Sequence, residues 1–330
     1  MEGKNMTPKI LKSILGILTT LLLLMTTLHV QASSFEGKKI LFINSYHDGY
    51  PWSDGITNGV KRTLADTGVN LKIVWMDTKR NTDETFITEA AQRVRKEIET
   101  FRPDVVIAAD DNASKHVIQP FFKDADLPFV FCGVNWDASI YGFPYKNVTG
   151  MVEVAGAKEL IEILRDLAKG QKIAMLANDT YTARKDMENY RDKLGIDISL
   201  KLVDSMTAWK ETYKAIQDQF DMLIIGNVAA IKDFNEQEAE AFAIENAKIP
   251  SGAVQMGAMR FAMIGYLKVP EEQGDWAAQT ALKIISGTSP AEIPIINNTR
   301  GTVIINAKIA LSADIEIPYK IVESAEQIIE

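Results

Sequence analysis

Short apolar runs alternate with amphipathic segments along most of the chain, and this alternation most limits the possible folds. In the first half the apolar runs predict strands at 39–43, 71–76, 105–109 and 128–132. Between them, apolar residues recur every three or four positions, which predicts helices near 56–64, 84–101 and 114–122. Strands rich in Val and Ile that are separated by helices form a parallel sheet covered on both faces.

The pattern then repeats and predicts a second lobe of the same kind. Helices are predicted at 156–168, 181–194 and 207–219, and strands at 172–176, 198–203 and 222–226. After Pro270 we predict a helix over 272–286, a strand at 303–305 and a terminal helix that begins near Val322. The fold class is therefore α/β, with two doubly wound parallel-sheet lobes that are joined by crossing strands near 149–154.

Charge and cysteine content exclude several classes of protein. The 330 residues include 36 Lys and Arg against 44 Asp and Glu, which gives a net charge of −8. Binding to phosphate backbones requires a basic surface, so we expect no nucleic-acid partner. Cys132, the single cysteine, lies in an apolar run, and we expect a buried, unreactive thiol.

Residues 1–32 have the features of a signal peptide. Lys4, Lys9 and Lys12 precede an apolar stretch at 14–28, and Ala32 ends a small-residue cleavage pattern. An uncleaved membrane anchor is the alternative, but the uncharged run over 13–28 is shorter than the roughly 20 residues that span a bilayer. We predict cleavage near Ala32 and a monomeric protein exported to the periplasm.

Signatures of catalysis and of cofactor binding are missing from the sequence. No glycine-rich nucleotide loop follows the first strand, and no Gly-x-Ser-x-Gly elbow occurs. After residue 32 the histidines are His47 and His116, too few for a multi-histidine zinc site. We therefore expect no enzymatic activity, no metal and no cofactor.

The loop at 44–54, between the first strand and the first helix, is rich in aromatic and hydroxyl groups. A serine near a helix N-terminus favours an anionic group, and aromatic rings can line a cavity. In the alternative interpretation, the aromatic rings fasten the loop to the lobe and the histidine lies at the surface. The candidate binding residues here are Ser45, Tyr46, His47, Tyr50 and Trp52.

Polar residues also follow several other predicted strands, and such ends meet at one edge of a parallel sheet. They suit a few oriented hydrogen bonds to a small organic ligand. Capping of the next helix is the alternative role for Asp111 and Asn112. Glu153, at the predicted crossing between lobes, either pairs with a ligand amine or is a solvated strand residue. Further candidates from these ends are Asn135, Asp179, Thr180 and Asn227, whereas Lys79 and Arg80 are expected at the surface.

Several of these segments carry a resemblance to a known family. They are Ser45-Tyr46-His47 through Tyr50-Pro51-Trp52, Met76-Asp77-Thr78-Lys79-Arg80, Arg102 to Ile107 with Asp110-Asp111-Asn112, Phe129 to Asn135, and Val148-Thr149-Gly150. The chain resembles ABC-transporter substrate-binding proteins of the type I periplasmic binding-protein fold, and also the extracytoplasmic sensor domains of histidine kinases. The likeness covers most of 38–330 and is looser in the second lobe.

The resemblance implies a division of the chain and a function. The implied N-terminal lobe is 36–152 with 265–290, and the implied C-terminal lobe is 153–264 with 291–330. The implied function is capture of a small organic solute by hinge closure in a ligand cleft between the lobes, for delivery to an ABC permease in the inner membrane. The alternative is a free-standing receptor that signals to a membrane sensor kinase. Some relatives handle aromatic amino acids, and Met256, Met259 and Phe261 are candidates for the pocket wall. Core filling is the alternative role for the two methionines.

Overall fold

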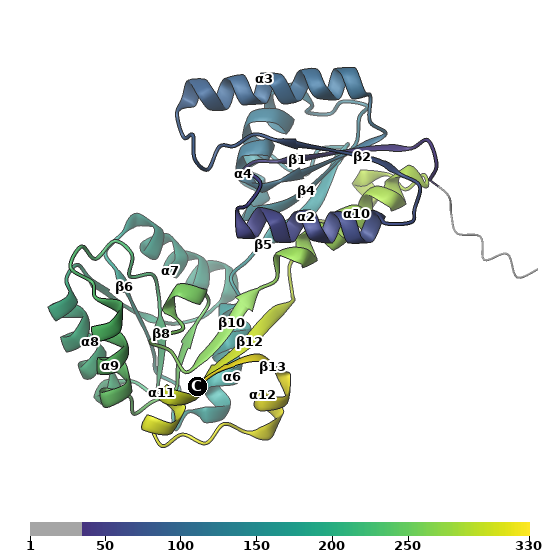
Figure 1. Ribbon diagram of the computed structural model, residues 1–330. Helices are drawn as coiled ribbons and strands as arrows, with labels where there is room; N and C mark the ends of the chain where they lie inside the picture. The colour runs from purple at the N-terminus through teal and green to yellow at the C-terminus, as the bar shows by residue number, and fades with distance from the viewer. Residues whose placement is uncertain (1–34) are drawn as a thin grey trace, which may run out of the picture.

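The computed structural model describes residues 35–330, so the predicted signal peptide at 1–32 lies outside the described residues. The described chain forms two α/β lobes, drawn one above the other in Figure 1. Each lobe contains one sheet, mostly parallel, with helices on both faces. The predicted fold class is confirmed.

The first lobe contains a six-stranded sheet within residues 35–330, in the order β11-β5-β4-β3-β1-β2. All neighbouring strands are parallel. The central strands are apolar and buried on both faces, as expected for a covered parallel sheet. The strands are β1 (Lys39–Asn44), β2 (Asn70–Trp75), β3 (Val105–Ala109), β4 (Phe129–Asn135), β5 (Val148–Glu153) and β11 (Ile296–Asn297).

Two helical layers cover this sheet. On one face α2 (Pro51–Leu64) packs against α10 (Pro270–Ile285) so closely that a Cβ on Gly274 would lie 2.0 Å from the Ile56 carbonyl oxygen. The other face carries α3 (Glu84–Phe101) and the helical run of α4 (Asp110–Ala113), η1 (Ser114–Ile118) and α5 (Gln119–Phe121). That run begins at Asp110, four residues before the prediction. Two single turns complete the lobe, η2 (Ala138–Tyr141) and η4 (Pro290–Glu292).

The second lobe contains a seven-stranded sheet among the described residues, in the order β13-β12-β10-β9-β8-β6-β7. β10 and β12 are antiparallel, and the other neighbours are parallel. The strands are β6 (Ile173–Asn178), β7 (Ser199–Val203), β8 (Met222–Ile225), β9 (Ser251–Ala253), β10 (Ile264–Lys268), β12 (Gly301–Asn306) and β13 (Ala325–Ile329). The helices are α6 (Ala157–Leu167), α7 (Tyr181–Leu194), α8 (Met206–Gln219), α9 (Glu236–Asn246), η3 (Met256–Ala258), α11 (Ala307–Ser312) and α12 (Tyr319–Ser324).

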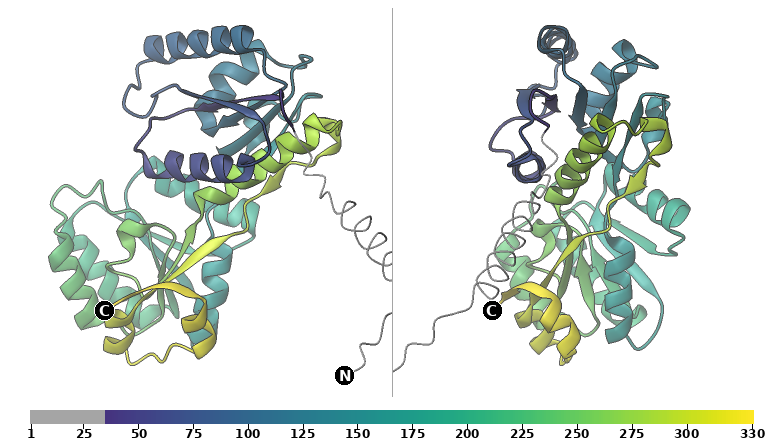
Figure 2. Two further views of the ribbon diagram at one scale, coloured as in Figure 1. Left: turned by 45° about the vertical axis from the view of Figure 1, so that its right-hand side comes forward. Right: turned by 90° about the vertical axis from the view of Figure 1, so that its right-hand side faces the viewer.

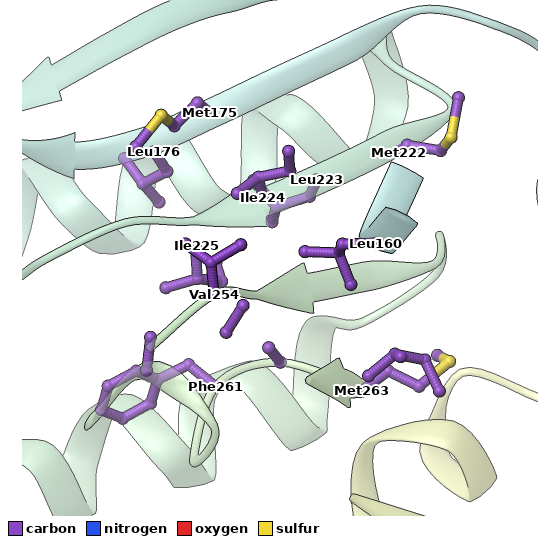
Figure 3. Packing of buried hydrophobic residues seen from close by; sticks show 14 of the residues in the cluster. Leu160, Met175, Leu176, Met222, Leu223, Ile224, Ile225, Val254, Phe261 and Met263 are labelled. Atoms are coloured by element: carbon purple, nitrogen blue, oxygen red, sulfur yellow. The ribbon is translucent and has the colours of Figure 1, made fainter. Parts of the chain in front are cut away.

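The core of the second lobe lies between this sheet and its helices (Figure 3). Leu160 of α6 packs on the sheet at Gly252, where a Cβ would lie 2.7 Å from its side chain, and Phe261 lies at one end of the cluster. Met259 and Phe261 are fully buried in this core, while Met256 is 55% exposed. The expectation that these three side chains wall a ligand pocket is therefore wrong for the two buried ones.

Three segments connect the lobes on one side of the molecule: the chain after β5, the chain between β10 and α10, and the chain between β11 and β12 (Figures 1 and 2). Three predicted boundaries need correction. Glu153 is the last residue of β5 in the first sheet, so the chain leaves the first lobe after Glu153 and not after residue 152. β10 belongs to the second sheet, so the chain enters the first lobe after Lys268 and not at 265. β11 belongs to the first sheet, so the chain leaves that lobe after Asn297 and not at 291.

The predicted C-terminal helix is also wrong in part. α12 ends at Ser324, and the next five residues form β13, which pairs in parallel with β12 at the edge of the sheet. Cys132 is fully buried, as expected, and burial raises the pKa of its thiol. Across residues 35–330, no helix has both the length and the apolar character needed to cross a membrane.

Candidate ligand-binding site

Ser45 connects neighbouring strand ends of the first lobe through hydrogen bonds to the main chain. Its side chain is fully buried at the end of β1. The hydroxyl donates to the Ala109 carbonyl at 2.5 Å and accepts from the Ala113 amide at 2.8 Å. The two bonds tie the end of β1 to the last residue of β3 and to the last residue of α4, so Ser45 positions the site and does not present its hydroxyl to a ligand.

Asp110 lies fully buried where β3 turns into α4, with φ at +70°. Its Oδ1 accepts a hydrogen bond from the Trp52 indole N–H at 3.0 Å. The facing residue is Gly133, where a Cβ would lie 2.9 Å from Oδ1, so a larger residue would displace the carboxyl group. Burial, followed by the nearby charges of Glu153 and Asp111, raises the pKa of Asp110 well above its usual range.

Asp111 and Asn112 lie on the same turn and are held by hydrogen bonds within the lobe. Asp111 accepts from the Asn135 side-chain amide at 2.6 Å and from the Tyr141 hydroxyl at 2.8 Å. Asn112 donates to the Thr78 hydroxyl at 2.8 Å. The structure thus brings the predicted residues Asp111, Asn112 and Asn135 together at the ends of β3 and β4, with Asn135 exposed.

Aromatic residues of the 44–54 loop form one side of this region. Tyr46 and Tyr50 meet edge to face, with ring centroids 5.4 Å apart. Lys79 stands over both rings, with Nζ 4.9 Å from the Tyr46 centroid and 5.2 Å from the Tyr50 centroid. His47 lies beside Tyr50 at 5.8 Å, and its Nδ1 is 2.9 Å from the Asp48 carbonyl oxygen. We refer to Tyr46, Tyr50 and Lys79 as the aromatic rim.

The aromatic rim includes a residue that the sequence interpretation left at the surface. Lys79 is exposed, yet its charge reaches into the site and lowers the pKa of both Asp110 and Glu153. Burial raises the pKa of Tyr46, and Asp110, Asp111 and Glu153 raise it further. The rim therefore places one cation and two phenol groups beside a group of carboxylates.

Glu153 has a partner of its own. The carboxylate is buried and forms an ion pair with the Lys268 ammonium, which also lies 5.2 Å from the centroid of the Trp52 ring. Burial raises the pKa of Glu153, and the Lys268 charge opposes that rise. Of the two interpretations of Glu153, the solvated strand residue is wrong, because the carboxylate is buried. Pairing with a ligand amine stays a prediction, and in this structure Lys268 is the partner.

The second lobe contributes a cavity of about 340 Å³ at the ends of β6, β8 and β9. Thr180 and Asn227 line it, as predicted for strand-end residues. Thr180 also caps α7 by accepting from the Ala183 amide at 3.3 Å, and Asn227 accepts from the Ala229 amide at 2.8 Å. Asp179 does not line this cavity, because it turns to the surface and pairs with Arg184 at 2.5 Å.

The two lobes are in direct contact between the end of β4 and helix α7. Trp136, just after β4, packs edge to face on Tyr190 of α7 with centroids 5.8 Å apart. Asp137 and Lys193 form an ion pair at 2.7 Å beside it. Tyr190 also lines the 340 Å³ cavity, so the cavity lies next to first-lobe residues. No feature of the sequence indicated this contact for Trp136.

The groups assembled here are suited to binding a small molecule through hydrogen bonds and charge. It offers hydrogen-bonding amides, phenol and hydroxyl groups, one exposed cation and several carboxylates around a small cavity. Within the described part of the chain, no three His, Cys, Asp or Glu side chains converge as metal ligands do.

Comparison with known families agrees with this arrangement. The family model described as "ABC transporter substrate binding protein" matches residues 47–329. The chain belongs to this family. The curated proteins give no match to this substrate-binding protein.

Solved structures similar to this substrate-binding protein share its fold at low sequence identity. One is the ligand-free, open structure of a substrate-binding protein with adhesive properties from Clostridium difficile, with 17% identity, a TM-score of 0.68, and coverage of 88% of this chain and 99% of that chain. Another is an ABC domain in complex with L-Trp from Streptococcus pneumoniae, with 18% identity, a TM-score of 0.54 and the same coverage. A third is a periplasmic ribose ABC transporter protein from Conexibacter woesei, with 14% identity, a TM-score of 0.53, and coverage of 85% and 96%. The fold is that of type I periplasmic binding proteins.

Proposed function

We propose that the protein is the periplasmic solute-binding component of an ABC transporter and that its lobes close around a small organic solute. The observation that carries this proposal is that each lobe presents polar groups at the ends of its strands and that the two lobes are joined by one hinge. We call these two sets of groups the strand-end faces. The first lobe supplies the aromatic rim with Asp111, Asn112 and Asn135, and the second supplies the cavity lined by Thr180 and Asn227. A solute that touches both faces favours the closed state, which a permease can then recognise.

The similarity to solved structures supports an open conformation for this chain. The TM-score is 0.68 to the ligand-free, open structure and 0.54 to the complex with L-Trp, at equal coverage. Asn135 and Asn227, one from each face, are exposed side chains. We infer that closure brings these two amides toward one solute.

The solute that suits these groups best is an amino acid, with an aromatic side chain favoured. Tyr46 and Tyr50 offer rings for stacking, and Lys79 offers a cation to a carboxylate group. The bound L-Trp of the Streptococcus pneumoniae structure supports an aromatic amino acid as the first class to test.

Location and partners follow from the same proposal. The predicted signal peptide at 1–32 would deliver the chain to the periplasm, where a monomer would present its solute to an inner-membrane permease. Deletion of the gene should abolish uptake of the solute in cells. Normal uptake after deletion would contradict the transport function and favour delivery to a membrane sensor.

A thermal-shift screen tests the binding function. Purified protein is heated with amino acids, nucleosides, sugars and organic acids in turn. A ligand at a hundred times its dissociation constant adds about 2.7 kcal/mol, and each kcal/mol raises Tm by roughly 2–4 °C in a domain of this size. A rise of several degrees with one class of compound supports the proposal. A flat screen of protein shown by mass spectrometry to carry no bound small molecule contradicts it.

A further inference from the structure

Glu153 and Lys268 meet at the hinge although they belong to different lobes. Glu153 is the last residue of β5 in the first sheet, and Lys268 is the last residue of β10 in the second. In their ion pair the Glu153 side chain is 8% exposed and the Lys268 side chain 27% exposed. A carboxylate buried to this extent is costly to leave without a cation, so the position requires some positive group.

An aromatic ring completes the surroundings of the Lys268 ammonium. Its Nζ lies 5.2 Å from the centroid of the Trp52 ring, within the range of a cation–π interaction. The Trp52 indole N–H donates to Asp110 Oδ1 at 3.0 Å, and this bond fixes the orientation of the ring. A buried carboxylate beside a fixed aromatic face is a suitable binding site for an ammonium group.

We propose that Glu153 and the Trp52 ring form a cation-binding subsite at the hinge end of the cleft, which Lys268 occupies as an internal ligand until the ammonium group of a solute replaces it. This subsite deepens the proposed solute-binding function and rests on it. Because Lys268 is carried by the second lobe, its replacement releases that lobe from a first-lobe contact. Binding of the ammonium group is thereby coupled to movement at the hinge.

The released Lys268 has a second carboxylate within its own lobe. Asp186 of α7 lines the 340 Å³ cavity and is partly buried. Burial raises the pKa of Asp186, and the charge of Lys268 lowers it. We expect Lys268, once released from Glu153, to turn toward this carboxylate.

Chemical rescue tests this subsite without knowledge of the natural solute. In Lys268→Ala the truncated side chain leaves room beside Glu153, and ethylammonium chloride serves as the probe. At ten times its dissociation constant, ethylammonium should raise the Tm of Lys268→Ala by about 3 °C, in a saturable way and beyond the effect of equal sodium chloride. The wild type and Lys185→Ala, which removes an exposed ion pair with Glu188, should show no such rise.

Two outcomes of this experiment decide the proposal. Loss of the rescue in the double variant Glu153→Gln/Lys268→Ala supports it, because the carboxylate is then required. An equal response of Lys268→Ala and Lys185→Ala to ethylammonium overturns it. That result would not bear on the solute-binding function, which the thermal-shift screen tests independently. The two proposals can therefore be contradicted one at a time.

Acetylation of lysines keeps the proposal testable if Lys268→Ala does not fold. In the wild-type protein Lys268 should react several-fold more slowly than Lys185, as measured by mass spectrometry, because its ammonium is held between Glu153 and the Trp52 ring. The variant Glu153→Gln should raise the rate at Lys268 and leave Lys185 unchanged. An unchanged rate at Lys268 in this variant overturns the proposal.

Discussion

The first lobe brings its charged and aromatic side chains to the cleft in a connected network, whereas the second lobe surrounds a cavity mainly with small residues and amide groups, together with Tyr190 and Asp186. In the first lobe Trp52 bonds to Asp110, and Asp111 bonds to both Asn135 and Tyr141. In the second lobe the cavity of about 340 Å³ is lined by alanine, glycine and amide groups among others.

This difference indicates a division of roles. Side chains that are fixed by hydrogen bonds before a ligand arrives lose little entropy on binding, so the first lobe is preorganised for specific contacts. A cavity lined by small groups accepts several shapes and mainly completes the enclosure. We expect substitutions in the first lobe to affect stability and affinity more than those in the second.

Trp52→Ala should give the largest change. It removes a half-buried ring and leaves the Asp110 oxygen without its N–H donor. We expect the free energy of unfolding to fall by about 2–3 kcal/mol, while Trp52→Phe, which keeps an aromatic ring of smaller size but loses the donor, costs about 1 kcal/mol. Urea unfolding measures both changes. Tyr181 of the second lobe is exposed, so Tyr181→Ala serves as the control and should change the free energy of unfolding by no more than about 0.5 kcal/mol. Equal costs for Trp52→Ala and Tyr181→Ala would remove the contrast between lobes.

The affinity for the solute should also differ between first-lobe and second-lobe variants, by a smaller amount. Tyr46→Ala and Asp111→Ala each remove a first-lobe contact and should weaken binding of the compound found by thermal shift about tenfold, or about 1.4 kcal/mol, without unfolding the protein. Asn227→Ala in the second lobe should weaken binding only a few-fold. Isothermal titration calorimetry measures all three. A larger loss in Asn227→Ala than in both first-lobe variants would reverse the assigned roles.

Asp110→Asn should change how stability depends on pH. Burial and the neighbouring Glu153 and Asp111 raise the pKa of Asp110, so between this raised value and the unfolded value of about 3.9 the native chain binds more protons than the unfolded chain. Wild-type stability from this group therefore increases as the pH falls through the raised pKa. Asparagine does not titrate and keeps an oxygen for Trp52.

The variant should consequently be more stable than the wild type at pH 8, and the difference should shrink toward pH 4. Denaturant unfolding at pH 8, 6 and 4 gives the comparison. A difference that grows as the pH falls would mean that Asp110 is stabilised as a carboxylate, contrary to its buried position.

Lys193→Ala should have the smallest effect. Hydrogen bonds from Lys193 and Ser139 lower the pKa of Asp137 to about 2, so the contribution of this carboxylate is lost only as the pH falls through that value. Both side chains of the pair are more than a third exposed, and solvent screening limits its contribution to about 0–1 kcal/mol. Unfolding measured in 0.1 M and 1 M NaCl should show a smaller difference from wild type at high salt. A cost above 2 kcal/mol would show that this contact stabilises the interface between the lobes strongly.

The sequence predicted most of the fold because buried parallel strands are short, apolar and separated by helices. The prediction was wrong where the local sequence pattern does not reflect the place of a segment in the sheet. Residues 325–329 form an edge strand with three consecutive exposed positions, so they lack the alternation or apolar run that indicates a strand. The crossings after Lys268 and Asn297 were not predicted, since the composition of a strand does not indicate which of the two sheets it joins.

The site was predicted less completely than the fold. Strand ends revealed Asp111, Asn112, Asn135, Thr180 and Asn227, because topology alone brings such ends to the cleft. The role of Ser45 was not predictable, since a hydroxyl at a strand end bonds to main chain as readily as to a ligand. The positions of Lys79 and Lys268 depend on partners in remote parts of the chain, such as Tyr46 and Glu153, and no local spacing indicates them.

Closure of the two lobes on a solute is the central claim, and small-angle X-ray scattering tests it most directly. The radius of gyration is measured for the protein alone and at saturation with the compound that raises its Tm. We predict a smaller radius of gyration in the saturated sample, because contact with both strand-end faces favours the closed state. An unchanged radius of gyration at saturation would contradict hinge closure.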